Sequence, residues 1–339
     1  MTALTGPTGL NRTGAGSPDG DAGNGARRSS RVGRPSSGHG RLVAACAVLS
    51  GLGMLVVAWP PGDLGSFGSL MQTFLPWSGV GVIVLAALAA VRRSVVAAVA
   101  VLLPALVWCS LFGGTVLDKR GAGGDITVVS HNVHDANPDP AGTARSLAAS
   151  GAQVVALEEL TPGATPAYER ALAGSYRYHW VQGSVGLWST WPLRDVRPVE
   201  IMPWTRALRA TVDTPKGPLA MYTAHLASVR VSLGRGFATA RRNEAAAKLA
   251  AAVRAEPLHR VVVVGDFNGT TDDSALNPVT AGLRSAQEEA GAGFGFSWPA
   301  SFPVVRIDQI LVKGVAPVAA WTLPRTGSDH LPVAASLRL

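Results

Sequence analysis

Residues 260–268 read RVVVVGDFN, in which four consecutive valines lead into a glycine, Asp266 and Asn268. An unbroken β-branched run predicts a strand buried on both faces, because a half-exposed strand would alternate apolar and polar residues. The carboxylate and the amide come directly after this run, where a rigid strand holds a loop in place. The stretch therefore predicts a layered domain with polar groups at one edge of a sheet.

The same pattern recurs through residues 121–339. Strands are predicted over 126–133, 153–160, 219–226, 260–268, 306–312 and 330–339, and helices over 141–150 and 238–253. Strands that alternate with helices are typical of an α/β or α+β layered domain. No internal repeat is visible in the sequence.

Acids, amides and imidazoles occupy the ends of these apolar strands. They are Asn132, Glu159, His225, Asp266, Asn268, Asp308, Asp329 and His330. Oxygen ligands without thiolates suit a hard cation such as Mg²⁺ or Mn²⁺. The sequence has neither a Gly-x-Ser-x-Gly turn nor a glycine-rich phosphate loop with lysine. A metal, a carboxylate near an imidazole, and amide donors suit the attack of water on a phosphorus ester.

The composition is too apolar for an ordinary soluble protein, since 47% of the 339 residues are hydrophobic and the mean hydropathy is +0.23. Three uncharged stretches lie between Arg41 and Asp63, between Asp63 and Arg92, and between Arg93 and Asp118. Each is about as long as a membrane-spanning helix requires. We therefore expect three transmembrane helices within residues 41–118; the alternative is a cleaved signal peptide followed by a hydrophobic hairpin.

Residues 1–40 are rich in Gly, Ser, Pro and Arg and are predicted to be a disordered tail. This tail is basic, the first connection contains Asp63 without Lys or Arg, and the second contains Arg92 and Arg93. Because basic flanks stay in the cytoplasm, this pattern predicts a cytoplasmic N-terminus and an extracytoplasmic C-terminal domain. Lys119 and Arg120, after the third stretch, weakly favour the opposite orientation.

The distribution of charge argues against a long polyanionic partner. Residues 1–120 contain 10 Lys and Arg against 4 Asp and Glu, whereas residues 121–339 contain 20 against 18. The net charge of +8 therefore comes mostly from the tail and membrane region. The two cysteines, Cys46 and Cys109, lie in apolar runs, so neither a disulfide framework nor a thiolate metal site is expected.

Seven short segments resemble motifs of the endonuclease/exonuclease/phosphatase superfamily, whose fold is that of DNase I. They are HNV (131–133), VVALEEL (154–160), VGLWSTWPL (185–193), TAHL (223–226), GDFN (265–268), RIDQIL (306–311) and SDHLPV (328–333). They occur in the family's order over about residues 124–339. The resemblance implies a catalytic domain over 121–339, built as a four-layer sandwich of two mixed sheets flanked by helices.

The resemblance also implies a role for each matching metal-site residue. Glu159 would be the principal ligand of Mg²⁺ or Mn²⁺, assisted by Asn132 and Asp329. Glu158 stands where the family has glutamine, so that it either adds negative charge near the metal or points away. His131 and His134 flank Asn132 without a role in the family motif, and we expect them at the surface or behind the site.

The catalytic residues that the resemblance implies are His225, Asp266, Asn268, Asp308 and His330. Asp266 would orient or deprotonate the attacking water, and Asn268 would donate to the phosphoryl oxygens. His330, held by Asp308, would contact the phosphate, and His225 would bind the phosphate or assist the leaving group. Whether Asp266 or His330 is the base stays open at this point.

Substrate-binding candidates follow from residue type alone. Arg230, Arg235, Arg241 and Arg242 form either a solvated helix face or a cluster that binds a phosphate or pyrophosphate. Trp298 and Phe302 precede RIDQIL and either line an apolar pocket or pack in the core. Gln309 occupies a position where the family often has an aromatic residue, which argues against substrate stacking there.

Three classes of function fit this reading. The first is hydrolysis of a lipid-linked phosphate, such as a polyprenyl pyrophosphate, at the outer face of the membrane, with no protein partner predicted. The order of segments resembles the actinobacterial teicoplanin-resistance group, which implies a role in the cell envelope or in antibiotic resistance. The second is an extracytoplasmic nuclease, which the balanced charge of residues 121–339 disfavours. The third is a non-catalytic envelope protein.

Overall fold

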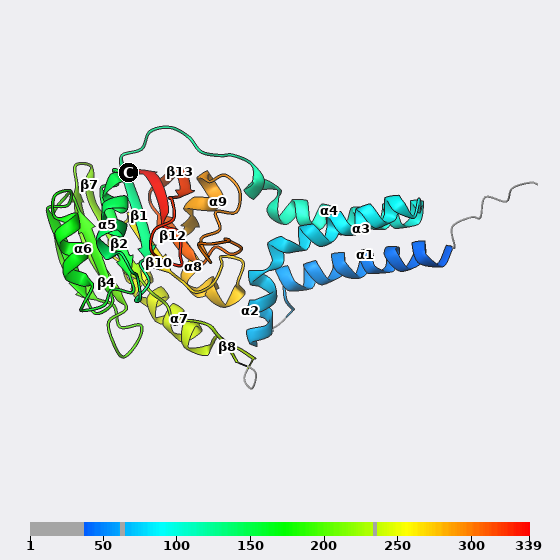
Figure 1. Cartoon of the computed structure of the whole chain (residues 1–339), viewed down its shortest axis with the longest axis horizontal. Helices are drawn as coiled ribbons and strands as arrows, with labels where there is room; N and C mark the ends of the chain where they lie inside the picture. The colour runs from blue at the N-terminus through cyan, green and yellow to red at the C-terminus, as the bar shows by residue number, and fades with distance from the viewer. Residues whose placement is uncertain (1–36, 62–64, 233–235) are drawn as a thin grey trace, which may run out of the picture. The chain divides into compact units, whose positions relative to one another are not determined.

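The computed structural model describes residues 37–61, 65–232 and 236–339 (Figure 1). The side chains of Ser37 and of residues 230–237 lie outside the description. The predicted disordered tail lies outside the described residues up to position 36. From Gly38 onward the chain forms one compact unit.

Two six-stranded sheets form the C-terminal domain. The first has the order β13 (Ala316–Thr322), β14 (Val333–Arg338), β1 (Ile126–Asn132), β2 (Val154–Glu158), β4 (Val185–Ser189) and β3 (Tyr178–Gln182). The second has the order β11 (Arg284–Ser285), β12 (Asp308–Lys313), β10 (Val261–Asp266), β7 (Gly217–Ala224), β6 (Ala207–Thr214) and β5 (Leu193–Pro198). The pairs β1–β2 and β7–β10 are parallel and the others are antiparallel, so both sheets are mixed.

Helices cover the outer face of each sheet. The first sheet packs against α5 (Pro140–Ala149) and α6 (Thr165–Leu172), through Leu147, Tyr168 and Trp188 among others. The second packs against α7 (Ala240–Arg254) and α8 (Asn277–Thr280). Two further short helices, η2 (Ser274–Leu276) and α9 (Ala286–Ala290), lie in its connections. The predicted four-layer sandwich of two mixed sheets flanked by helices is therefore confirmed.

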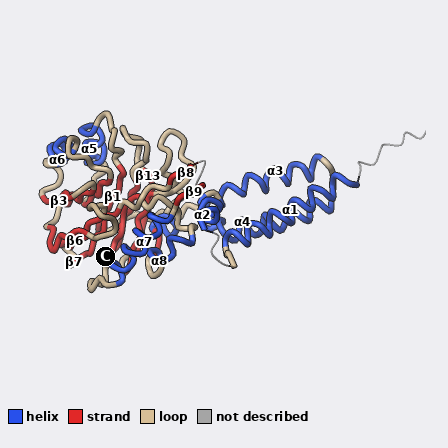
Figure 2. The backbone as a smooth tube through the Cα atoms, turned by 90° about the horizontal axis from the view of Figure 1, so that it is seen from below, coloured by secondary structure: helices blue, strands red, loops and turns tan. Residues whose placement is uncertain are grey.

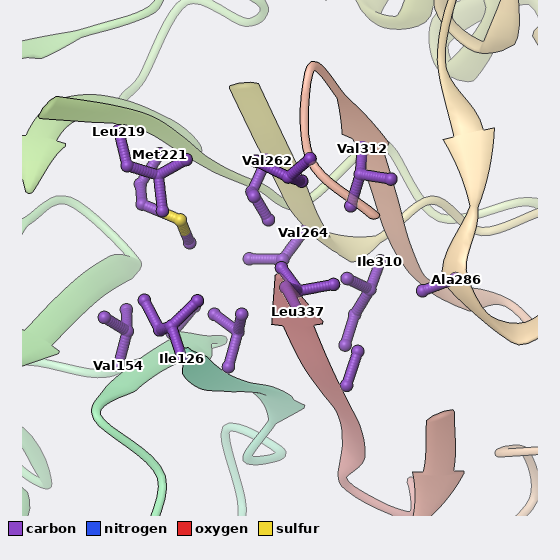
Figure 3. Close-up of a cluster of buried hydrophobic side chains, with 14 of the residues drawn as sticks. Ile126, Val154, Leu219, Met221, Val262, Val264, Ala286, Ile310, Val312 and Leu337 are labelled. Atoms are coloured by element: carbon purple, nitrogen blue, oxygen red, sulfur yellow. The ribbon is translucent and has the colours of Figure 1, made fainter. Parts of the chain in front are cut away.

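The four valines of β10 explain how the layers are held together. Val262 and Val264 belong to the core between the two sheets, which Figure 3 shows, whereas Val261 and Val263 belong to the core beneath α7. All four side chains are fully buried. Because successive side chains point to opposite faces of a strand, a strand between two apolar layers must be apolar at every position.

The N-terminal part is helical (Figure 2). It contains α1 (Ser37–Ala58), α2 (Gly65–Thr73), the short η1 (Leu75–Trp77), α3 (Ser78–Val91) and α4 (Val95–Val116). Two helices, Gly38–Ala58 and Val95–Val116, are long and apolar enough to cross a membrane. The middle predicted span differs from expectation, because it is a pair of helices bent by 53° at its break. A third span exists only if that pair is counted as one.

Polar residues of the middle segment bond to residues of the domain. Gln72 accepts hydrogen bonds from the amide and the hydroxyl of Ser274, at 2.9 and 3.0 Å. Ser69 donates to Asp273 at 3.0 Å. α2 is therefore held by the polar surface of the domain, whereas α3 is apolar throughout.

Candidate active site

The predicted site residues converge at one edge of the sandwich. Asn132 and Asp266 are the last residues of β1 and β10, while Glu159 and His225 directly follow β2 and β7. Asp308 begins the antiparallel strand β12 and pairs in register with Asp266. Parallel strands end at the same edge of a sheet, so this topology gathers side chains that are far apart in sequence.

A first cluster of ionisable groups surrounds His134. The Nδ1 atom of His134 lies 3.4 Å from Asp329 Oδ1, 3.8 Å from Asp135 Oδ1 and 3.9 Å from Glu159 Oε2. Glu159 also accepts a hydrogen bond from the Asp135 amide at 3.3 Å. The side chains of Glu159 and Asp329 are 24% and 48% exposed, so the cluster is open to solvent.

A second cluster lies deeper and contains Asp266, Asp308 and His330, all buried. His330 Nδ1 lies 2.9 Å from Asp308 Oδ2 and 3.1 Å from Oδ1, which fixes the orientation of the imidazole. Its other nitrogen, Nε2, lies 3.9 Å from Asp266 Oδ2. The predicted pairing of Asp308 with His330 is therefore present in the structure.

Asn132 and His225 join the two clusters. Asn132 donates from Nδ2 to Asp266 at 3.0 Å and accepts at Oδ1 from the His134 amide at 3.0 Å. His225 Nε2 lies 3.5 Å from Glu159 Oε1 and 3.6 Å from Asp266 Oδ2. Neither ring nitrogen of His225 has a hydrogen-bond partner among the described residues, although the ring is buried. A buried imidazole without partners, between two carboxylates, indicates a site built for a ligand.

The environment sets the protonation states of three central groups. Burial, assisted by Asp308, raises the pKa of Asp266 to about 7 against the opposing effect of His330. Burial alone would lower the pKa of His330, but Asp308 and Asp266 outweigh it and raise that pKa to about 10. Burial, with Arg206 and His330 nearby, lowers the pKa of His225 well below its ordinary value. At neutral pH the site thus combines a cationic His330, a neutral His225 and an Asp266 near its midpoint.

The backbone is constrained at the same place. His134, Glu159 and Asn268 have positive φ values of 63°, 60° and 48°, and they are three of the five non-glycine residues with positive φ in the described part of the chain. Such conformations concentrate at functional sites, where the surrounding fold compensates their strain. Gly265 has φ 137°, and a Cβ there would lie 1.8 Å from the Ala224 carbonyl oxygen, so the GDFN turn requires glycine.

The residues predicted to contact the substrate differ in where the structure places them. Trp298 donates from Nε1 to Asp329 at 3.4 Å, which places the indole beside the first cluster. Arg241 lines a cavity near His225. Arg242 does not fit the predicted phosphate-binding cluster, because its guanidinium is buried and paired with Asp273 at 2.6 Å. The side chain of Arg230, at the start of β8 (Arg230–Ser232), and the whole of Arg235 lie outside the described part.

Asn268 is turned toward the protein. Its Nδ2 donates to Asp266 at 3.1 Å and to the Leu226 carbonyl at 3.2 Å, and its amide donates to Asp266 at 2.8 Å. In this arrangement Asn268 orients the Asp266 carboxylate. Its donation to a phosphoryl oxygen stays a prediction.

Sequence reasoning missed several groups at the site. His134 lies within the acidic cluster, and Arg206 donates to the carbonyl oxygens of His225 and Leu226 at 3.1 and 3.3 Å. No motif contains Arg206, so only the tertiary structure brings it to the site. His131 is fully buried and lies 2.9 Å from the Thr326 hydroxyl.

The open question about Glu158 has a physical answer. The side chain is fully buried and accepts a hydrogen bond from Ser130 at 3.0 Å. Burial, followed by the charge of Asp308, raises its pKa well above the ordinary value. The site thus favours the protonated form of Glu158, and a protonated carboxylic acid resembles glutamine in shape and charge.

The model of the Endonuclease/Exonuclease/phosphatase family matches residues 129–330, which is more than half of the chain. The chain belongs to this family. No curated protein matches it. The endonuclease/exonuclease/phosphatase domain also resembles solved structures in fold.

One similar structure is the Bacteroides thetaiotaomicron mannosyl-6-phosphatase Bt3783, at 17% identity and a TM-score of 0.53, covering 63% of this chain and 100% of that one. Another is D. rerio TDP2 complexed with single-strand DNA product, at 20% identity and a TM-score of 0.53, covering 63% and 99%. A third is the beta toxin of Staphylococcus aureus, at 14% identity and a TM-score of 0.51, covering 62% and 99%. Family members with this fold thus include phosphatases and nucleases.

The residues present fit the divalent metal that is typical of the endonuclease/exonuclease/phosphatase family. Two groups of three residues, His134–Asp135–Glu159 and Asp266–Asp308–His330, place potential ligand atoms within 4.8 Å of one another. The first group is more open to solvent and lies beside Asp329. Carboxylate oxygens with few nitrogen donors suit a hard cation.

Proposed function

We propose that the chain is a membrane-anchored, metal-dependent phosphoesterase that hydrolyses a phosphate or pyrophosphate ester of a membrane lipid at the outer membrane face. The observation that carries the proposal is the junction of two carboxylate–histidine clusters through Asn132 and His225. One cluster suits a cation and the other suits proton transfer. Hydrolysis of a phosphorus ester requires both.

In this proposal Glu159 and Asp329, assisted by Asn132, hold Mg²⁺ or Mn²⁺, and His134 lies among them. The ion, when bound, polarises a phosphoryl oxygen and neutralises its charge. Because its side-chain oxygens accept three hydrogen bonds, Asp266 is held in one orientation. Its pKa of about 7 suits the removal of a proton from water near neutral pH, so we assign Asp266 as the base.

The two histidines have separate roles in this scheme. His330 is kept cationic by Asp308 and stabilises the charge that develops on the phosphoryl group. His225 is neutral and contacts the phosphoryl oxygen or the leaving oxygen from its position between Glu159 and Asp266. Both imidazoles lie within 4 Å of Asp266 Oδ2, and the charge of His330 opposes the rise in the Asp266 pKa that burial causes.

The lipid substrate is supported by the apolar helices and by the charge of the domain. Helices Gly38–Ala58 and Val95–Val116 would hold the domain at the membrane surface. A domain with 20 basic and 18 acidic residues has little long-range attraction for a nucleic-acid strand. The order of segments resembles the teicoplanin-resistance protein VanJ, so we include a role in the cell envelope or in glycopeptide resistance.

The proposal is tested with the full chain in detergent and Mg²⁺ or Mn²⁺. Phosphate release from a polyprenyl pyrophosphate is measured beside the cleavage of single- and double-stranded DNA, with Asp266→Asn as the control. Phosphate release that the variant lacks, with intact DNA, supports the proposal. DNA cleavage without lipid turnover would instead assign an extracytoplasmic nuclease. If the chain catalysed neither reaction, that result would favour a non-catalytic protein.

The proposed orientation has a separate test. A C-terminal reporter that is active only outside the cytoplasm should be active in cells, because the basic tail and Arg92–Arg93 are expected to stay inside. A reporter that is active only in the cytoplasm should be silent. The reverse result would place the domain on the inner face.

A further inference from the structure

A cavity of about 480 Å³ is lined by Arg206, whose guanidinium donates to the backbone carbonyl oxygen of His225. Its walls include Met202, Trp204, Arg206, Ala227, Ser228 and Arg241. A smaller cavity of about 270 Å³ adjoins it and shares Met202, Trp204 and Arg241 with it. Two arginines and an indole that is 53% exposed therefore line a space next to the proposed reaction centre.

Arg206 differs from the most buried arginines of the domain in its partners. Arg209, Arg242 and Arg306 each have a carboxylate oxygen within 3 Å, from Glu256, Asp273 and Glu288. The half-buried Arg206 donates only to the two backbone carbonyls of His225 and Leu226. It has no ion-pair partner within the described ranges.

Arg241 extends the cationic wall from the neighbouring helix. It occupies the first turn of α7 and is exposed, with no ion-pair partner in the part of the chain that the structure describes. One turn further along, Glu244 pairs with Lys248 at 2.7 Å, so the acidic residue nearest to Arg241 on the helix already has a cation. For the half-buried Arg206, the lack of an ion-pair partner among the described residues indicates an anionic ligand, because burying an unpaired charge is unfavourable. Arg241 adds a second, solvent-exposed cation to the same cavity wall.

We propose that Arg206 and Arg241 bind a second phosphoryl group of the substrate, next to the one that is hydrolysed, so that the chain prefers diphosphate esters to monophosphate esters. This inference rests on the proposed function, whose site it extends. Arg206 contacts the carbonyl of His225, and His225 faces Glu159 and Asp266, so the second phosphate lies directly beside the first. Guanidinium groups bind phosphate oxygens through two parallel hydrogen bonds. Met202 and Trp204 provide an apolar wall for the group that the diphosphate carries.

The experiment compares farnesyl diphosphate with farnesyl monophosphate, both in detergent, with the full chain and Mn²⁺. We expect kcat/KM to be at least tenfold higher for the diphosphate. Arg241→Met and Arg206→Met should each lower kcat/KM for the diphosphate by about tenfold to 100-fold, mainly through KM, because each removes charge-assisted hydrogen bonds. Arg206→Lys should retain part of that activity. The monophosphate should change less than about threefold in Arg241→Met.

Arg254→Met is the matched control. Arg254 is an exposed arginine in the last turn of the same helix and does not line the cavity. Its substitution should leave both substrates unchanged. Equal losses on the two lipids in Arg206→Met and Arg241→Met would mean that the arginines only support the fold, and would overturn the inference without affecting the proposed function.

A binding measurement keeps the inference testable if neither lipid is hydrolysed, a result that would count against the proposed function. Methylenediphosphonate should bind the wild-type chain in calorimetry more tightly than inorganic phosphate, and both arginine variants should weaken it at least tenfold. Unchanged diphosphonate binding would overturn the inference. The inference would also be overturned if the two arginine variants bound a single-stranded oligonucleotide more weakly but bound the diphosphonate unchanged. The arginines would then bind the phosphates of a nucleic acid.

Discussion

Leu49 of α1 and Leu106 of α4 expose 67% and 68% of their side chains, whereas the four valines of β10 are fully buried. Both regions consist of aliphatic residues. The layers of the domain bury the valines of β10, whereas the packing of the helices leaves many of their aliphatic side chains exposed. The small buried clusters of the helical part centre on residues such as Ala47 and Ala97. In the proposed function, a bilayer would supply for α1 and α4 the apolar environment that the first sheet and α7 supply for β10.

The polar groups of the two regions differ in the same way. Inside the domain, charges are paired and held in fixed positions, as for Arg209 with Glu256 and for Asp308 with His330. The long helices α1 and α4 contain one charged residue between them, Arg41 near the start of α1. Four substitutions, each with its measurement, test this contrast. They are given in order of the expected effect on activity, stability or membrane insertion, from the largest to the smallest.

Asp308→Asn should lower activity by about 10²–10⁴-fold, because His330 loses the carboxylate that orients it and keeps it charged. The wild-type imidazole has a pKa of about 10 and stays protonated through neutral pH. In the variant that pKa falls, so the remaining activity should decline as pH rises through it. A pH–rate profile of both proteins checks this, and parallel profiles would show that Asp308 does not control the charge of His330.

Glu256→Gln should lower the free energy of unfolding of the domain by about 3–5 kcal/mol at neutral pH, because it leaves Arg209 buried without a counter-charge. Burial opposes ionisation of Glu256, but Arg209 and Tyr222 lower its pKa from 4.5 to about 2. The ion pair therefore contributes fully above pH 4.5, and the contribution is lost as pH falls toward 2. Denaturation of both proteins at several pH values should show the difference narrowing on acidification.

Tyr222→Phe is the milder control for that substitution. It removes the 2.7 Å hydrogen bond to Glu256 and leaves the ion pair in place, so about 1–2 kcal/mol should be lost. Activity per folded molecule should be unchanged in both variants. If the difference in free energy of unfolding between the wild type and Glu256→Gln stayed constant down to pH 3, it would contradict the pKa assigned to Glu256.

Leu106→Arg should disfavour membrane insertion of α4 by about 3–4 kcal/mol, since Leu106 lies near the middle of a candidate span. Phe302, which is 70% exposed in the domain, is the matched position outside the helices. Phe302→Arg should change the stability of the domain by less than about 0.5 kcal/mol. The α4 segment with and without the substitution is compared in a translocon insertion assay. If the α4 segment inserted equally well with and without the substitution, the exposed aliphatic residues of α4 would not require a bilayer.

Ser69→Ala sharpens the boundary between the regions. The Ser69 hydroxyl donates to Asp273 at 3.0 Å and accepts from Arg242 at 3.3 Å, so it bridges α2 and a buried ion pair of the domain. Its loss should destabilise the domain by about 1.5–3 kcal/mol in thermal or urea unfolding.

Thr73→Val is the control for Ser69→Ala, because the Thr73 hydroxyl bonds only to the Ser69 carbonyl within the same helix. It should have a smaller effect on the unfolding of the domain. If both substitutions are neutral, α2 belongs to the helical part alone. If Ser69→Ala destabilises, a soluble fragment that begins at residue 121 should be less stable than the full chain.

The predictability of the fold varied with the strength of the local pattern. All six predicted strands and both predicted helices are present, because their apolar runs or periodic faces are long. The edge strands β3, β5 and β13 were not predicted, since their sequences mix polar and apolar residues at partly exposed positions. The buried strands β4 and β6 were also not predicted, because β4 is only five residues long and β6 contains Arg209, Thr211 and Asp213 among its apolar residues. The break of the middle apolar segment into two helices was not predicted either. The polar partners of Ser69 and Gln72 are about 200 residues away in the sequence, so no local pattern reveals them.

The sequence by itself determined the layered domain and the apolar helices, and it named eight residues of the candidate site, because each depends on local composition or on a short motif. The tertiary structure alone decided the groups that act through space. It placed His134 among three carboxylates, buried Glu158 so that its pKa is raised, and brought the unpaired Arg206 beside His225. It also removed Arg242 from the predicted phosphate-binding cluster by pairing it with Asp273. Burial and charge pairing depend on neighbours that are distant in sequence, so they become readable only when the chain is folded.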